Sequence, residues 1–323
     1  MTNPVGTFQT YQAIGNREDL SDMVFRISPT ETPFVSMAKR RKATNKLFEW
    51  QTDSLASANA TNAQVEGDTP SNTTVTPTTR LFNVTQISSK TFNISGTQQA
   101  VDPAGRENEL AYQLVKYSQE VKRDFEAGMS QNNSYRAGAS GTGRVSASLE
   151  SWMSTNWTTN GSAGSPASAG FSSTGTLAPV DNSLQGTVTQ ANVNAIIRAA
   201  WTAGGEPKVI LVGPYNKVKV SSFSGILSNT IQQQAGGQAT IIAAADAYQS
   251  DFGLLKVIPS RFNRDRTLCV LDMNYWAIAY LRPFMQVPLA KVGDSDQRMV
   301  LVEGGLESRN EAASGKVADL ATS

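Results

Sequence analysis

The 323-residue sequence contains no histidine. This absence excludes Ser-His-Asp and Cys-His catalytic arrangements, proton transfer by imidazole, and every zinc or haem site that uses a histidine ligand. Carboxylates are the only remaining candidates for metal ligands or proton carriers. The sequence therefore argues against an enzyme, and we expect neither a cofactor nor a metal.

Cysteine, net charge and long apolar runs are also scarce. The single cysteine, Cys269, cannot form an intrachain disulfide, and its apolar neighbours predict a core residue. With 28 Lys and Arg against 27 Asp and Glu, the net charge of +1 creates no global field for nucleic acid or anionic lipid. No stretch approaches the ~18 apolar residues of a membrane span, and the N-terminus lacks signal-peptide regions. We therefore expect that the protein has no membrane partner and is located in the reducing cytoplasm.

Residues 1–45 predict an extended N-terminal arm. The apolar spacing over residues 18–27 predicts a short helix, which two prolines then interrupt. The arm has too few apolar residues to bury themselves. We therefore expect it to lie on the body of its own subunit or on a neighbouring chain, with Phe34 and Met37 as contacts.

A basic run, Lys39, Arg40, Arg41 and Lys42, follows in the same arm. Two interpretations have equal weight: contact with phosphates of DNA, or pairing with carboxylates of a neighbouring chain. Four charges without interleaved aromatic residues are too few for sequence-specific readout of nucleic acid.

Residues 46–100 predict a long two-stranded excursion. Residues 46–52 alternate as a strand does, and residues 82–94 repeat apolar side chains with the same period of two. A polar loop of about 24 residues, 56–79, separates them, which is unusual inside a compact domain. Because a two-stranded ribbon is marginally stable alone, we expect it to need a partner surface. Its predicted contact residues are Phe48, Trp50, Phe82, Phe92 and Ile94.

The next segment predicts a long helix over residues 102–129, with Asp102 as its N-cap and Pro103 at the first helical position. Apolar residues at helical spacing form one stripe, and charged residues occupy the opposite face. The stripe, which we expect to hold the subunit together, consists of Leu110, Leu114, Tyr117, Val121 and Phe125.

The remaining chain mixes helices and strands in a non-repeating order, which predicts the α+β class. Residues 135–190 are rich in Gly, Ser and Thr and predict an irregular insertion. The expected helices cover residues 189–203 and 215–223. The expected strands cover residues 209–212, 239–245, 254–258, 267–271, 276–281, 285–291 and 298–303.

Short motifs give no catalytic site. Asp251-Phe252-Gly253 matches a kinase signature, but the catalytic-loop histidine cannot exist. Asp294 and Asp296 lack the glycine and distal glutamate of a calcium loop, so they predict a solvated hairpin turn. A carboxylate-based hydrolase would need two facing acidic residues, and no spacing singles out such a pair.

Five segments of the sequence are distinctive as a set. They are GNREDLSDMVFRISPTETPF (15–34), FEWQTDSLA (48–56), ISGTQQAVDPAGRENELAYQLVKYSQEVKRDFE (94–126), VILVGPYNKVKVSSF (209–223) and ESRNEAASGKVADL (307–320). With these segments, and in the order of its parts, the sequence resembles the major capsid proteins of tailed bacteriophages, which have the Hong Kong 97-type fold. The first three segments are the more specific ones.

The resemblance implies a division of the chain into parts. These are an N-terminal arm (1–45), an extended β-hairpin loop (46–100), the spine helix of a peripheral domain (101–135), an axial domain with a Gly/Ser-rich insertion (136–265), return strands of the peripheral domain (266–305) and a C-terminal segment returning to the axial domain (306–323).

The resemblance also implies a function. The protein would form hexamers and pentamers and assemble into the icosahedral head of a double-stranded DNA phage. Implied partners are a scaffolding protein, the portal, a decoration protein and non-specifically packaged DNA. The implied locations are the virion and, during assembly, the host cytoplasm. The alternative interpretation is a phage tail component or adhesin that binds a surface through the Ser/Thr/Trp-rich middle.

Overall fold

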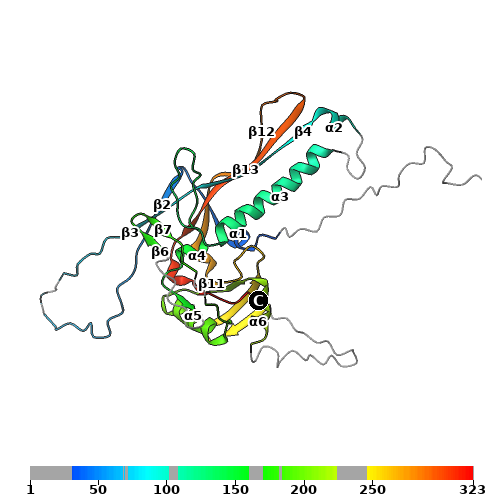
Figure 1. Cartoon of the computed structure of the whole chain (residues 1–323). Coiled ribbons are helices and arrows are strands. Elements are labelled where there is room, and N and C mark those ends of the chain that lie inside the picture. Colours follow the sequence, from blue (N-terminus) through cyan, green and yellow to red (C-terminus); the bar gives the residue numbers. More distant parts are fainter. Residues whose placement is uncertain are drawn as a thin grey trace, which may run out of the picture.

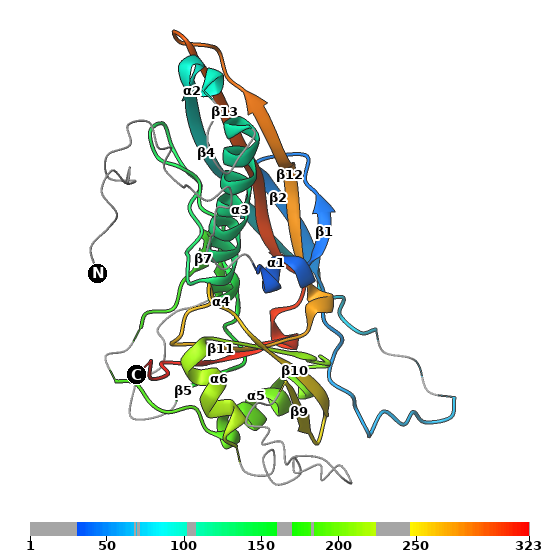
Figure 2. The same ribbon diagram turned by 90° about the vertical axis from the view of Figure 1, so that its right-hand side faces the viewer.

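The computed structural model describes residues 31–67, 69, 72–101, 108–159, 170–181, 184–223 and 246–322. An elongated part contains a long helix beside a sheet, and a second, smaller part contains another sheet (Figures 1 and 2). The expected helix over residues 18–27 and the expected strand over residues 239–245 lie outside the described residues. None of the described helices combines the length and apolar character needed to cross a membrane.

The elongated part is built on a four-stranded sheet with the strand order β1-β12-β13-β4. Strand β1 pairs parallel with β12, and the other neighbours are antiparallel. The strands are β1 (Lys39–Lys42), β12 (Trp276–Pro288), β13 (Ser295–Ser308) and β4 (Gln86–Ser95). Because β1 has one partner strand among the described residues, the basic run forms an edge of this sheet.

Helix α3 (Glu109–Ser130) runs along the sheet. Asn108 caps it, because its side chain accepts a hydrogen bond from the backbone N–H of Ala111. The expected cap, Asp102, lies outside the described residues. Val121 and Phe125 are almost fully buried. Leu110, Leu114 and Tyr117 pack partly buried against the same core, so the apolar stripe of the sequence faces the sheet.

The hairpin of β12 and β13 is longer than the sequence indicates. The sequence predicts two separate strands over residues 276–281 and 285–291, whereas the structure has one continuous strand. The register shifts between Tyr280 and Arg282 and again between Arg282 and Met285. These irregularities break the alternation of side chains, which explains why the sequence pattern there resembles two strands.

The smaller part contains a six-stranded sheet with the order β5-β14-β11-β8-β10-β9. Its strands are β5 (Trp157–Thr159), β14 (Gly315–Ala318), β11 (Leu268–Leu271), β8 (Val209–Val212), β10 (Gly253–Pro259) and β9 (Ala247–Ser250). The helices of this part are α5 (Gln190–Thr202) and α6 (Pro214–Ser221). The central strands β8 and β11 are buried throughout, as their continuous apolar runs require.

The remaining elements are short. They are α1 (Pro33–Met37), α2 (Gly96–Ala100), α4 (Leu149–Trp152), β6 (Gly170–Ser172), β7 (Gly175–Leu177), η3 (Met273–Tyr275) and η4 (Glu311–Ala313). Strands β6 and β7 belong to the Gly/Ser-rich region, which therefore contains a pair of antiparallel strands.

The extended hairpin consists of β2 (Leu47–Thr52) and β3 (Thr79–Val84), and its last pair is Thr52 with Thr79. Strand β4, which the sequence analysis placed in the same ribbon, instead pairs with β13 in the four-stranded sheet. The ribbon therefore ends at Val84. The period of two identifies both strands but does not identify their partners.

Candidate functional site

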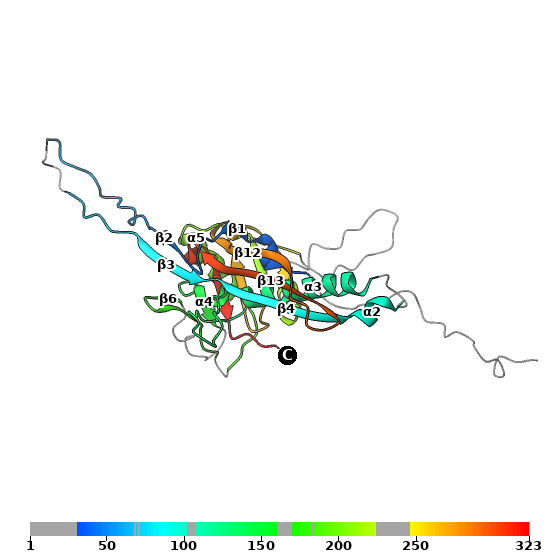
Figure 3. The same cartoon turned by 90° about the horizontal axis from the view of Figure 1, so that it is seen from above.

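The most prominent exposed feature is the loop between β2 and β3, residues 53–78, which we call the hairpin loop. It projects well beyond the two sheets (Figure 3). Its described residues form no helix or strand. Leu55, Val65 and Val75 are 100 %, 74 % and 88 % exposed. These side chains give the loop apolar area that a contact with another molecule would bury.

The base of the hairpin is anchored to the chain itself. Phe48 is 5 % exposed and stacks on Trp50, with ring centroids 5.7 Å apart. The indole N–H of Trp50 donates to the backbone carbonyl of Ser308 at 2.8 Å. Phe82 packs edge-on against the rings of Tyr135 and Phe171. These aromatic contacts are intrachain. They correct the expected neighbour contact for Phe48, which its own chain covers, whereas Trp50 and Phe82 are partly exposed and their contact with a neighbour stays a prediction.

The same correction applies to β4 and to the arm. Phe92 and Ile94 are each 7 % exposed, and Phe92 stacks on Tyr117 of α3 with a centroid distance of 5.0 Å. Phe34 of α1 is completely buried, and Met37 packs partly buried against the same core. A sequence pattern shows that an apolar face exists, but it does not show which surface covers that face.

A buried carboxylate holds the arm against α3. Both oxygens of Glu126 accept backbone N–H groups at 2.8 Å, one from Phe34 and one from Val35. Burial raises the pKa of Glu126 to about 7, and the two hydrogen bonds only partly oppose this rise. We call this contact the Glu126 clasp. Nothing in the helical pattern distinguishes Glu126 from the solvated charges beside it.

The basic run lies on the edge strand β1, where Lys39, Arg40 and Lys42 are exposed. Arg41 is the exception, because its guanidinium pairs with Glu307 of β13 at 2.5 Å. The expected carboxylate partner of Arg41 is therefore in the same chain. Beside β1 is a hollow of about 390 Å³, whose lining combines apolar side chains with two cations. Its lining includes Val35, Arg40, Lys122, Tyr280 and Phe284.

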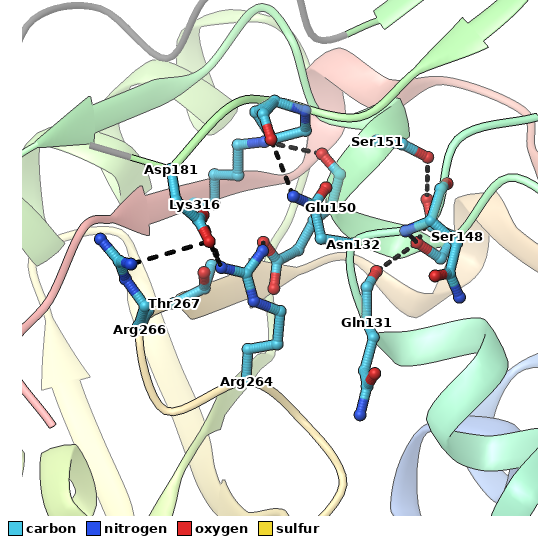
Figure 4. Close-up of polar contacts among 12 residues, drawn as sticks. Gln131, Asn132, Ser148, Glu150, Ser151, Asp181, Arg264, Arg266, Thr267 and Lys316 are labelled. Atoms are coloured by element: carbon cyan, nitrogen blue, oxygen red, sulfur yellow. Dashed lines mark hydrogen bonds and ion pairs between the residues drawn. The ribbon is translucent and has the colours of Figure 1, made fainter. Parts of the chain in front are cut away.

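A group of charged residues, of which Glu150 and Lys316 are buried, ties the smaller sheet to the middle of the chain (Figure 4). Arg264 pairs with Glu150 at 3.3 Å and with both oxygens of Asp181 at 2.5 Å. The ammonium of Lys316, on β14, donates to the backbone carbonyl of Glu150 at 2.6 Å. Burial raises the pKa of Glu150 and lowers the pKa of Lys316.

These charged pairs have a structural role. The buried pairs join segments that are more than a hundred residues apart, and a buried charge tolerates the loss of its partner poorly. Within the described part of the chain, no group of three or more Asp, Glu or Cys residues is arranged to hold a metal ion. Sequence reasoning missed these pairs, because charged residues in a strand or loop pattern normally predict solvent exposure.

Comparison with known proteins gives a consistent result. The family model of the SU10 major capsid protein matches residues 3–321. The major capsid protein of Escherichia phage Phieco32 is 28 % identical over 365 aligned positions, covering 98 % of this chain and 97 % of the relative.

Solved structures of phage-type capsids share the fold at low sequence identity. The capsid of a native GTA particle has a TM-score of 0.63 at 12 % identity, covering 97 % of this chain and 98 % of the other. The capsid protein of cyanophage A-1(L) has a TM-score of 0.64 at 11 % identity, with the same coverages. The phage G structure, which contains gp27 major capsid proteins and gp26 decoration proteins, has a TM-score of 0.55 at 11 % identity, covering 99 % and 100 %. These likenesses confirm the predicted α+β class and Hong Kong 97-type fold.

Proposed function

Because the chain belongs to the SU10 major capsid protein family and is a structural subunit of a phage capsid, we propose that it assembles as hexamers and pentamers into an icosahedral head around double-stranded DNA. The observation that carries this proposal is the exposed hairpin loop, whose apolar side chains have no cover within the described chain. The tail or adhesin interpretation is not favoured, because the family and the curated relative are both major capsid proteins.

The acidic hairpin loop of one copy is proposed to contact the basic β1 edge of a neighbour. Residues 53–78 contain Asp53, Glu66 and Asp68 and neither Lys nor Arg. The neighbouring surface offers Arg40 and Lys122 beside the apolar side chains that line the same hollow. Opposite charges steer and orient two copies, while the exposed apolar residues of the loop supply buried area.

The edge position of β1 supports the same contact. Its outer backbone groups have no strand partner among the described residues, so an extended segment has hydrogen-bonding groups to approach. Like charges keep one β1 strand from pairing with another copy of itself. An acidic segment does not meet that repulsion, which favours the hairpin loop as the occupant.

Further partners belong to the same proposal. These partners are a scaffolding protein during assembly in the host cytoplasm, a portal and a decoration protein. The exposed cations Lys39, Arg40 and Lys42 are either contacts for packaged DNA or sites for the neighbour's carboxylates. The near-neutral net charge suits a shell that encloses DNA without binding it tightly.

One experiment tests the role of the loop. Residues 54–77 are replaced by Asn-Gly, which leaves the paired strands β2 and β3 intact. Co-expressed with the other head proteins, the shortened chain should remain soluble but form no closed shells by electron microscopy. Normal shells from the shortened chain would refute the role of the loop, and monomers from the unaltered chain would refute the assembly itself.

A charge exchange tests the proposed partner surface. Glu66→Lys should lower the yield of shells at least tenfold, and adding Lys42→Glu should restore part of it. Lys208→Glu, at an exposed position outside β1, is the matched control and should not restore the yield. Equal rescue by both second changes would show that the loop does not recognise β1.

A further inference from the structure

Helix α1 depends on the rest of the subunit for its structure. It has five residues, and its N-cap Thr32 makes no side-chain capping bond. A helix this short is not stable by itself in water. Figures 1 and 2 place α1 beside the C-terminal end of α3. Its principal contacts there are the fully buried side chain of Phe34 and the Glu126 clasp.

The clasp is an expensive place for a negative charge. Glu126 is fully buried, and the N–H groups of Phe34 and Val35 are the hydrogen-bond donors to its two oxygens. Burial and these two donors are the influences on its charge, and no Lys or Arg of the described chain pairs with it. A buried carboxylate without a cation is costly, and the cost disappears when the group returns to water. Because α1 covers Glu126, the departure of α1 would return the carboxylate to water.

The other ionisable groups around the clasp titrate in a different pH range. Helix α1 itself contains no charged residue. Arg40 of β1, Lys122 of α3 and Tyr280 of β12 line the hollow beside Val35. Burial raises the pKa of Tyr280, the charge of Arg40 opposes this rise, and the charge of Glu126 adds to it. Side chains of these three types ordinarily titrate above about pH 9, so ionisation at the clasp below pH 8 belongs to Glu126.

We propose that the Glu126 clasp is a latch, which lets α1 leave α3 as one unit while the rest of the subunit stays folded. The ionisation of Glu126 sets the balance between docked and released α1. Docked α1 favours the protonated carboxyl, because release returns this group to water. The released fraction therefore rises with pH between the pKa values of the two states and is constant above them. The latch lies within one subunit, so it does not depend on how copies assemble.

Hydrogen exchange of the backbone amides in the unassembled full-length chain measures this release. The amides of Phe34, Val35, Ser36 and Ala38 all donate hydrogen bonds in the docked state. After division by the intrinsic exchange rate at each pH, they should share one protection factor, at least tenfold lower than those in the interior of α3. Local release exposes little surface, so urea should scarcely change this factor, whereas it should strongly lower the factors of α3.

The pH dependence tests the part played by Glu126. The shared protection factor should fall about 300-fold between pH 4.5 and pH 8, because it changes tenfold for each pH unit from 4.5, the pKa of the exposed carboxyl, to about 7, its pKa in the docked state. Glu126→Gln should remove this pH dependence. The control Asp124→Asn, which changes an exposed carboxyl on the same helix, should keep it.

Three results would overturn the proposal. If the α1 amides share the protection and the urea dependence of α3, α1 leaves only when the whole subunit unfolds. If fast exchange is confined to Phe34 and Val35, the clasp opens without the departure of α1. If the fall with pH is less than tenfold, or persists in Glu126→Gln, Glu126 does not control the release. The first two results need only the wild-type chain, so they decide the matter even when the variant does not fold.

Discussion

The Glu126 clasp predicts a specific dependence of subunit stability on pH. The carboxyl titrates near 4.5 in an unfolded chain and near 7 in the folded one. Between these values the folded state keeps the proton and the unfolded state releases it. The free energy of unfolding must therefore fall as pH rises through this window.

The size of the effect follows from the two pKa values. A difference of one unit corresponds to about 1.4 kcal/mol, so the change from 4.5 to about 7 amounts to about 3 kcal/mol. Glu126→Gln removes the titration. Its amide oxygen can accept only one of the two backbone N–H groups, which costs about 1–3 kcal/mol relative to the wild type at the lowest pH, where the wild-type carboxyl keeps its proton in the folded state.

The assay compares the unassembled wild-type and Glu126→Gln chains by urea denaturation at pH 4.5, 6, 7 and 8. Other groups titrate in both chains, so they cancel in the difference between the two unfolding free energies. The wild type should lose about 3 kcal/mol relative to the variant from the lowest to the highest pH. A difference that stays constant over this range would refute the buried clasp.

Three further predictions concern the interior. Arg264→Leu leaves Glu150 buried without its ion-pair partner and should lower the free energy of unfolding, measured by urea denaturation, by about 3–5 kcal/mol. The control Lys208→Leu breaks an exposed pair with Glu206 and should change the free energy of unfolding little. Equal losses in the two variants would contradict the reasoning. Gly305→Ala places a Cβ 2.4 Å from the Val84 carbonyl oxygen and should cost about 1–3 kcal/mol, whereas Gly143→Ala meets open space. A similar loss at both glycines would argue against that close approach. Cys269 should resist maleimide until the chain unfolds, as mass spectrometry would show, and rapid labelling of the native chain would contradict its burial.

Helix α3 shows how much of the structure the local sequence pattern predicts. A spacing of three and four residues is a property of the helix itself, so the stripe from Leu110 to Phe125 could be identified without knowing its partner. The end of the same helix near the arm shows the limit. Glu126 follows directly on Phe125 and occupies a charged position in the pattern, yet it is buried under α1 because the arm crosses it there.

The strands after residue 80 show the same difference between what the local pattern predicts and what long-range contacts decide. A period of two identified apolar faces at Phe82 and at Phe92, but a strand pattern does not encode its partner. One strand pairs within the hairpin, and the next pairs with β13, which is about 200 residues away in sequence. The buried pair of Glu150 and Arg264 likewise depends on a long-range approach that no local spacing signals.

The distinctive segments were enough to indicate a capsid subunit through their resemblance to a known family, and the absence of histidine excluded histidine-based chemistry, because neither feature depends on folding. Only the folded chain decided which apolar residues it covers itself and which it leaves exposed. Burial is set by segments distant in sequence, and here it assigns Phe34, Phe48 and Phe92 to the interior while the hairpin loop stays open to a neighbour.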